Sequence, residues 1–133
     1  MYKRALQIAY NAHKGQLRKQ SCVPYIVHPI RVANCFQDDV KKTIAILHDV
    51  VEDTAFTLNN LETIFPLCVT SVVDCLSKRI EETHFDYIKR VKKNEIATEI
   101  KIVDIVDNLS DTLCVVSDSM AERYDKSLKI LIN

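Results

Sequence analysis

Residues 43–54, TIAILHDVVEDT, place four ionisable side chains inside an apolar segment: His48, Asp49, Glu52 and Asp53. Their neighbours are mainly isoleucine, leucine, valine and alanine, the composition of a helix that packs in a protein core. Because moving isolated carboxylates out of water is strongly unfavourable, a compensating partner has to lie nearby. On a helix, side chains four residues apart share a face, so His48 aligns with Glu52 and Asp49 with Asp53.

The chain around this segment has a helical pattern. Its 133 residues include one glycine and three prolines, which leaves little material for hairpin turns. Apolar residues recur with helical spacing, and we predict one all-α domain of about seven to eight helices that spans residues 1–133. Thr54 and Thr57 are candidate N-caps for one of these helices. The predicted helices cover residues 2–14, 28–36, 38–53, 58–65, 66–78, 79–94, 95–113 and 118–132.

Charge and cysteine content narrow the class of protein. Basic and acidic residues each number 18, and this zero net charge argues against a general nucleic-acid or membrane surface. No apolar run approaches the roughly 20 residues that cross a bilayer, and the N-terminus lacks a signal-peptide pattern, so we expect a cytoplasmic protein. The five cysteines form no C-x-x-C pair, which fits a reducing compartment. We predict that Cys68 and Cys75 are small buried hydrophobes.

Two further positions would complete a metal site with His48 and Asp49. His28 precedes Pro29 at the start of a predicted helix, and Asp104 lies within the apolar pattern IKIVDIVDNL. Two imidazoles and two carboxylates from three helices suit Mn²⁺, Fe²⁺ or Zn²⁺, and coordination would offset the cost of burying the charges. Two simpler interpretations remain open. His48 fits a hydrogen-bonded core histidine, and Asp104 fits a hydrogen-bonded buried carboxylate.

Four motifs, in chain order, resemble the HD-domain hydrolases of the RelA/SpoT type. They are AHKGQLRK (12–19), PYIVHPIRVA (24–33), AILHDVVEDT (45–54) and IKIVDIVDNLSD (100–111). The resemblance covers nearly the whole chain and is greatest to the small stand-alone alarmone hydrolases, including the metazoan SpoT homologues. It implies an all-helical HD fold in a single hydrolase domain. It also implies Mn²⁺-dependent removal of the 3′-pyrophosphate of (p)ppGpp, the alarmone of the stringent response.

The resemblance assigns roles to individual residues. Glu52 and Asp53 match the pair that positions and activates the attacking water, since a carboxylate one helical turn from a ligand can accept a proton. Arg18 and Lys19 match a basic loop that meets the nucleotide, where arginine suits bidentate phosphate contacts. The remaining assignments are His28, His48, Asp49 and Asp104 as metal ligands, with Asn108 and Tyr124 as substrate contacts. We assign His13 to support of the loop and His84 to the surface.

Two positions depart from the family pattern. Ile105 stands where an arginine usually follows the metal aspartate, and Asp107 stands where histidine or tyrosine usually precedes the asparagine. Both favour an alternative substrate for the same chemistry, such as the 2′-phosphate of NADPH or a nucleoside monophosphate. A non-catalytic, antitoxin-like binding module is a further alternative, although such a module would not need Glu52 and Asp53. We expect no synthetase domain, and hence no alarmone synthesis.

Overall fold

The computed structural model describes residues 1–19, 21–111 and 116–133, and within these ranges it contains nine α-helices and no strand. The all-α prediction is confirmed, with one helix more than the eight predicted because the end of the predicted helix 38–53 forms a separate short helix, α4. The helices are α1 (Tyr2–Ala12), α2 (Val27–Asn34), α3 (Asp39–Leu47), α4 (Val50–Asp53), α5 (Leu58–Glu62), α6 (Leu67–Cys75), α7 (His84–Lys92), α8 (Glu95–Ser110) and α9 (Asp118–Ile132).

Short polar side chains set where these helices begin. The Asp38 carboxylate accepts the Lys41 backbone N–H at the start of α3. The Thr57 hydroxyl and the Asn60 side chain form a capping box for α5. Thr57 is therefore the N-cap of this helix. Thr54 is not, because its hydroxyl donates to the Val50 carbonyl at the end of α4.

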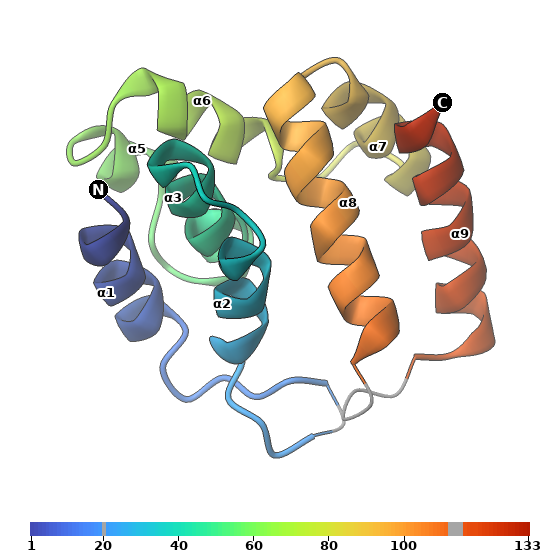
Figure 1. Cartoon of the computed structure of the whole chain (residues 1–133), viewed down its shortest axis with the longest axis horizontal. Coiled ribbons are helices and arrows are strands. Elements are labelled where there is room, and N and C mark those ends of the chain that lie inside the picture. Colours follow the sequence, from blue (N-terminus) through green and yellow to red (C-terminus); the bar gives the residue numbers. More distant parts are fainter. Residues whose placement is uncertain (20, 112–115) are drawn as a thin grey trace.

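Helix α3 forms the centre of the core. Ile44, Ile46 and Leu47 on this helix have no exposed surface, and α3 packs against α1, α2 and α6. Figure 1 shows α8 between this group and the pair α7 and α9, which pack together on the other side. Since α8 also contacts α2 and α3, residues on α8 can meet residues from the first half of the chain.

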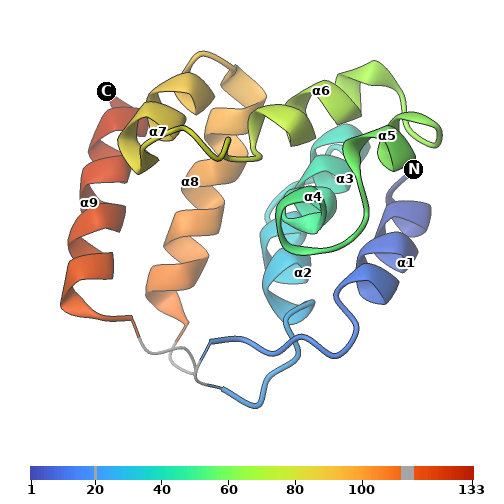
Figure 2. The same ribbon diagram turned by 180° about the vertical axis from the view of Figure 1, so that it is seen from behind.

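The predicted helix 38–53 is interrupted at His48 and Asp49. The His48 Nδ1 atom lies 2.5 Å from the Ala45 carbonyl oxygen, which a continuous helix would use to accept the Asp49 N–H. Helix α3 accordingly ends at Leu47, Asp49 adopts φ −101° and ψ −4°, and α4 begins at Val50 (Figure 2). The prediction of one continuous helix is wrong here. The Asp53 N–H still donates to the Asp49 carbonyl at 2.9 Å, so a helical hydrogen bond still joins Asp49 and Asp53.

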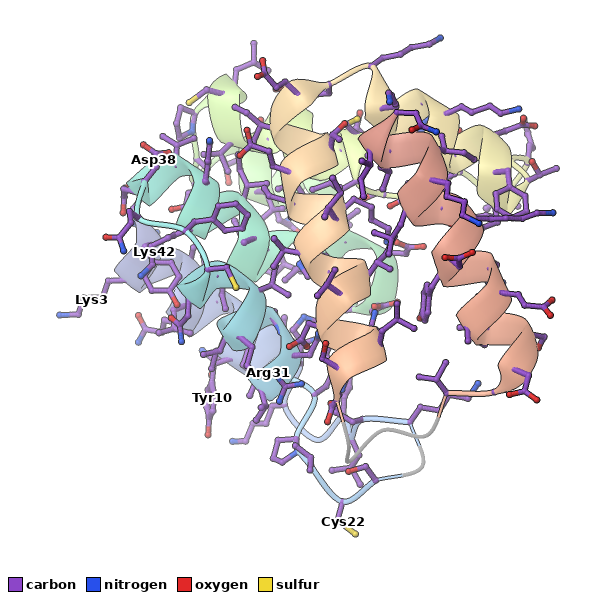
Figure 3. The ribbon with its side chains drawn as sticks, turned by 45° about the vertical axis from the view of Figure 1, so that its right-hand side comes forward. Lys3, Tyr10, Cys22, Arg31, Asp38 and Lys42 are labelled. Carbon is purple, nitrogen blue, oxygen red and sulfur yellow. The ribbon has the colours of Figure 1, made fainter. Side chains whose placement is uncertain are left out.

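The cysteine prediction is also wrong in part. Cys68 is exposed on α6 and Cys75 is only half-buried. Cys22 and Cys35 are exposed too, and Figure 3 shows the Cys22 side chain projecting from its loop. Cys114 lies outside the described residues. None of the described helices combines the length and apolar character that crossing a lipid bilayer requires.

Candidate functional site

Four side chains predicted to bind a metal converge on one point. The His28 Nε2 atom lies 2.7 Å from Asp104 Oδ1 and 3.9 Å from Asp49 Oδ2. The His48 Nε2 atom lies 3.0 Å from Asp49 Oδ2 and 3.2 Å from Asp104 Oδ1. All four of these potential ligand atoms lie within 4.8 Å of one another. The tertiary structure therefore assembles the N₂O₂ set from three parts of the chain.

The helix interruption explains how adjacent residues reach the same point. Neighbouring side chains on a regular helix diverge by about 100°. In the turn between α3 and α4, the side chains of His48 and Asp49 come within 3.0 Å of each other. His28 joins them from the first turn of α2, and Asp104 joins them from the buried face of α8.

Hydrogen bonds on the outer nitrogens fix the tautomers of both histidines. The Nδ1 atom of His48 must donate to the Ala45 carbonyl, because a carbonyl oxygen can only accept. The Nδ1 atom of His28 lies 2.6 Å from the Asp107 carboxylate and donates to it for the same reason. In the neutral imidazoles both Nε2 lone pairs therefore point toward Asp49 and Asp104.

This arrangement is suited to a cation. Two nitrogen lone pairs and two carboxylate oxygens would repel one another unless protons or a metal ion lay between them. In the absence of metal, burial lowers the pKa of each histidine, but the carboxylates outweigh it, so the pKa of His28 is raised and that of His48 is raised well above its usual value. A divalent ion would replace these protons, and two imidazoles with two carboxylates match the ligand preference of Mn²⁺, Fe²⁺ or Zn²⁺. The residues therefore fit a divalent metal ion.

Two residues that the sequence did not single out hold the carboxylates in place. The Tyr25 hydroxyl donates to Asp49 Oδ2 at 2.5 Å, and the Lys101 ammonium donates to Asp104 Oδ2 at 2.8 Å. Each contact restrains a carboxylate whose other interactions are with the histidines. For Lys101 a signal was available, since an opposite charge three residues before a buried aspartate shares its helix face. For Tyr25, the sequence contained no signal of this contact beyond the position of the residue in the PYIVHP motif.

Glu52 and Asp53 lie on α4, directly after the metal-ligand pair. Both are exposed at the surface. The pKa of Asp53 is raised to about 6, because neighbouring protein atoms reduce the solvation of its carboxylate and because Asp49 and Glu52 carry like charges. The same loss of solvation by neighbouring protein atoms, together with the Asp49 charge, raises the pKa of Glu52. Carboxylates with a raised pKa beside a charged centre are suited to accepting a proton near neutral pH.

The predicted substrate residues fall into two groups. Arg18 has only 6% of its surface exposed and donates to Asn108 Oδ1 at 3.0 Å, so these two predicted contacts meet directly. Arg18 also donates to Asp111 at 3.2 Å. Lys19 is exposed, and Tyr124 on α9 is half-buried.

The two departures from the family pattern have different structural roles. Ile105 is 1% exposed, and its side chain is part of the hydrophobic core. Asp107 accepts the hydrogen bond from His28 and also pairs with Arg31, whose Nε lies 2.8 Å from Asp107 Oδ1. Sequence reasoning treated Asp107 as a specificity position and did not identify Arg31. The i, i+3 spacing of His28 and Arg31 on one helix was the available signal.

The two remaining histidines lie outside the ligand set. His13 is buried, its Nδ1 lies 2.9 Å from Gln16 Oε1, and Gln16 in turn donates to the Asp53 carbonyl. These contacts agree with the predicted support of the loop. His84 was predicted on the surface, but it is half-buried and its Nε2 lies 3.0 Å from the buried Ser127 hydroxyl.

Comparison with known proteins identifies relatives of this chain. No protein-family model matches the chain. It is 43% identical over 75 residues to a guanosine-3′,5′-bis(diphosphate) 3′-pyrophosphohydrolase of Haemophilus influenzae, an alignment that covers 53% of this chain and 11% of the relative. It is 30% identical over 141 residues to a probable GTP pyrophosphokinase of Mycobacterium leprae, covering 96% of this chain and 18% of the relative.

A solved structure agrees with the sequence relatives. It is described as a metazoan orthologue of SpoT that hydrolyses ppGpp, and it matches with a TM-score of 0.81 and 26% identity over 98% of this chain and 83% of the other. The resemblance to RelA/SpoT-type hydrolases is confirmed. This chain spans less than a fifth of the curated RelA/SpoT-type relatives described above, 11% of one and 18% of the other.

Proposed function

We propose that this chain is a metal-dependent hydrolase that removes the 3′-pyrophosphate of (p)ppGpp, giving GDP or GTP and pyrophosphate. The observation that carries the proposal is the convergence of His28, His48, Asp49 and Asp104 next to the acidic pair on α4. The names of the sequence relatives and of the solved structure support the choice of substrate. The proposal treats residues 1–133 as a single HD hydrolase domain.

The protein's own groups have distinct tasks in this reaction. A bound divalent ion, proposed to be Mn²⁺, would supply a Lewis acid that stabilises negative charge on phosphoryl oxygens. Asp53, assisted by Glu52, would orient the attacking water and accept its proton. The water oxygen forms a bond to the phosphorus atom nearest the ribose, the bond from that phosphorus to the 3′ oxygen breaks, and the 3′ oxygen receives a proton.

Arg18 and Asn108 would hold the nucleotide. Their side chains already meet at 3.0 Å, and the buried Arg18 Nε has no hydrogen-bond partner among the described residues. A buried guanidinium N–H without an acceptor is unfavourable, and a phosphate or ribose oxygen would satisfy it. Lys19 and Tyr124 would add contacts from the loop and from α9.

Substitution of Asp53 tests catalysis directly. Asp53→Asn should reduce pyrophosphate release from ppGpp by roughly 100- to 10,000-fold, because it removes the group that accepts the proton. Metal content, measured by elemental analysis, should stay at the wild-type level since Asp53 is not a ligand. The exposed residue Glu62 on α5 offers a matched control, and Glu62→Gln should retain full activity.

The same variant separates catalysis from a binding role. If the chain were a non-catalytic, antitoxin-like module, Asp53→Asn would keep its biological effect along with its fold and metal. Absence of pyrophosphate release by the wild type at high enzyme concentration with Mn²⁺ would refute ppGpp as the substrate.

A second candidate is a nucleotide with fewer phosphates, such as NADPH or a nucleoside monophosphate. The supporting observation is the ion pair between Arg18 and Asp111, which neutralises one cation of the proposed nucleotide site. A panel of phosphorylated nucleotides assayed for phosphate and pyrophosphate release distinguishes the two candidates. We also propose the cytoplasm as the location, which the free cysteines at the four described positions support.

A further inference from the structure

An ion pair between Asp107 and Arg31 contacts His28 on the ring nitrogen that faces away from the other proposed metal ligands, and the proposed reaction does not use this pair. Asp107 Oδ2 accepts from His28 Nδ1 at 2.6 Å and from Arg31 Nη2 at 3.0 Å. Asp107 Oδ1 accepts from Arg31 Nε at 2.8 Å. The guanidinium therefore binds both carboxylate oxygens, and this bidentate contact fixes the plane of the carboxylate that orients the histidine.

Asp107 needs this partner because of its position on α8. It lies in the last turn of the helix, where the helix dipole disfavours negative charge, and that turn contains no basic residue. Asp111 follows four residues later as the C-cap and adds a second carboxylate on the same side. The compensating charges come from other elements, Arg31 on α2 and Arg18 in the loop before it. Figure 3 shows the Arg31 side chain beside this end of α8.

We propose that Asp107 and Arg31 are positioning residues of the metal centre. Asp107 holds His28 in the tautomer that turns Nε2 toward the ion, and Arg31 holds Asp107 in the orientation that this requires. A carboxylate bound to the outer nitrogen of a ligand histidine also makes that histidine a stronger donor to a metal. The inference deepens the proposed function, since it concerns the same metal site.

The pair also connects the metal centre with the substrate residues. Arg31 Nη2 donates to Asp111 Oδ2 at 2.8 Å, and Arg18 Nη2 donates to the same oxygen at 3.2 Å. Arg18 then reaches Asn108. One continuous set of hydrogen bonds therefore joins a metal ligand to the groups proposed to hold the nucleotide, and loss of Arg31 should disturb both ends.

Titration of Mn²⁺ into metal-free protein, without nucleotide, tests this role. Asp107→Asn keeps the shape of the side chain but removes its charge, and it should weaken Mn²⁺ binding about 10- to 100-fold, the range typical of such outer partners. Arg31→Gln should weaken it in the same direction by about tenfold. Because Arg31 acts through Asp107, the double variant should bind no more weakly than Asp107→Asn alone.

Two further variants complete the design. Arg31→Lys keeps the charge without the two-pronged geometry, so its Mn²⁺ affinity should lie between those of the wild type and Arg31→Gln. It also carries the test if Arg31→Gln fails to fold, as judged by circular dichroism. Arg79 pairs with Asp74 away from the metal ligands, and Arg79→Gln is the matched control that should leave Mn²⁺ affinity unchanged.

Unchanged Mn²⁺ affinity in Asp107→Asn and in the Arg31 variants would overturn the inference. So would a double variant whose loss equals the product of the two single losses. Neither result bears on the identity of the substrate, because the titration measures Mn²⁺ binding in the absence of nucleotide. Conversely, a wild type that binds Mn²⁺ but does not hydrolyse ppGpp would refute the proposed function and leave this inference intact.

Discussion

Replacement of His48 by alanine should remove the stabilisation that a bound metal gives to the fold. His48 supplies one of the four atoms that lie within 4.8 Å of one another, and two of the others belong to aspartates that repel each other. Without the imidazole, an ion would lose a nitrogen ligand that the rest of the set does not replace. The unfolded chain has no such cluster, so metal binds the native state and stabilises it by mass action.

The size of this effect can be worked out. At a free Mn²⁺ concentration about 100 times the dissociation constant, the wild type should gain about 2.7 kcal/mol. The unfolding entropy of globular proteins is about 2.1 cal/mol/K per residue, which for 133 residues gives about 0.28 kcal/mol/K. The melting temperature of the wild type should therefore rise by about 10 °C when Mn²⁺ replaces a chelator.

Differential scanning calorimetry with Mn²⁺ or with chelator measures this shift. His48→Ala should bind Mn²⁺ at least about 100-fold more weakly and so show a shift of less than about 2 °C at the same Mn²⁺ concentration. His84→Ala is the matched control, because His84 lies outside the ligand set and its loss should preserve the metal-dependent shift. An equal shift in His48→Ala and the wild type would refute the reasoning.

Three further outcomes are expected. Arg18→Gln should raise the KM for ppGpp about tenfold or more while leaving Mn²⁺ affinity unchanged, as steady-state kinetics and metal titration would show, because the proposed charge-assisted contact with the nucleotide is lost. Ile105→Arg, which introduces the residue usual in the family, should lower the free energy of unfolding by more than about 3 kcal/mol in urea titrations, because a charge would enter the core. Burial and the charge of Arg123 lower the pKa of His84 from 6.5 to about 4. Between these two pH values the folded state therefore binds fewer protons than the unfolded chain. Stability should then fall by about 2 kcal/mol from pH 8 to pH 5 through this group, and His84→Gln should lose less.

Local patterns were sufficient to predict most of the fold. Helices α6, α8 and α9 begin within one residue of their predicted starts, whereas α7 begins at His84, five residues after the predicted start at residue 79. Proline and polar caps mark those starts, and such signals act within one helical turn. The exposure of Cys68 was not predictable in this way, since a small apolar residue near the start of a helix has no strong preference for either face.

The candidate ligands were also predictable. Burying an ionisable side chain is energetically unfavourable, so such residues inside apolar runs indicate a compensating partner such as a metal ion. The outer contacts were only weakly indicated, by the i, i+3 spacing of Arg31 from His28 and of Lys101 from Asp104. Tyr25, Arg31 and Lys101 are residue types that serve equally well on a surface, and only their neighbours in space give them a role at the metal centre.

The sequence by itself determined the helices and the residues that can bind a metal, since both depend on side-chain type and on spacing along the chain. Only the tertiary structure decided how these residues meet. The interruption after Leu47 lets His48 and Asp49 reach one point, and the packing of α2 and α3 on α8 brings Asp104 to them. Asp107, which stood out in the sequence as a departure from the family, lies against His28 through the same packing. These contacts join residues 56 to 79 positions apart, a distance over which sequence periodicity carries no information about geometry.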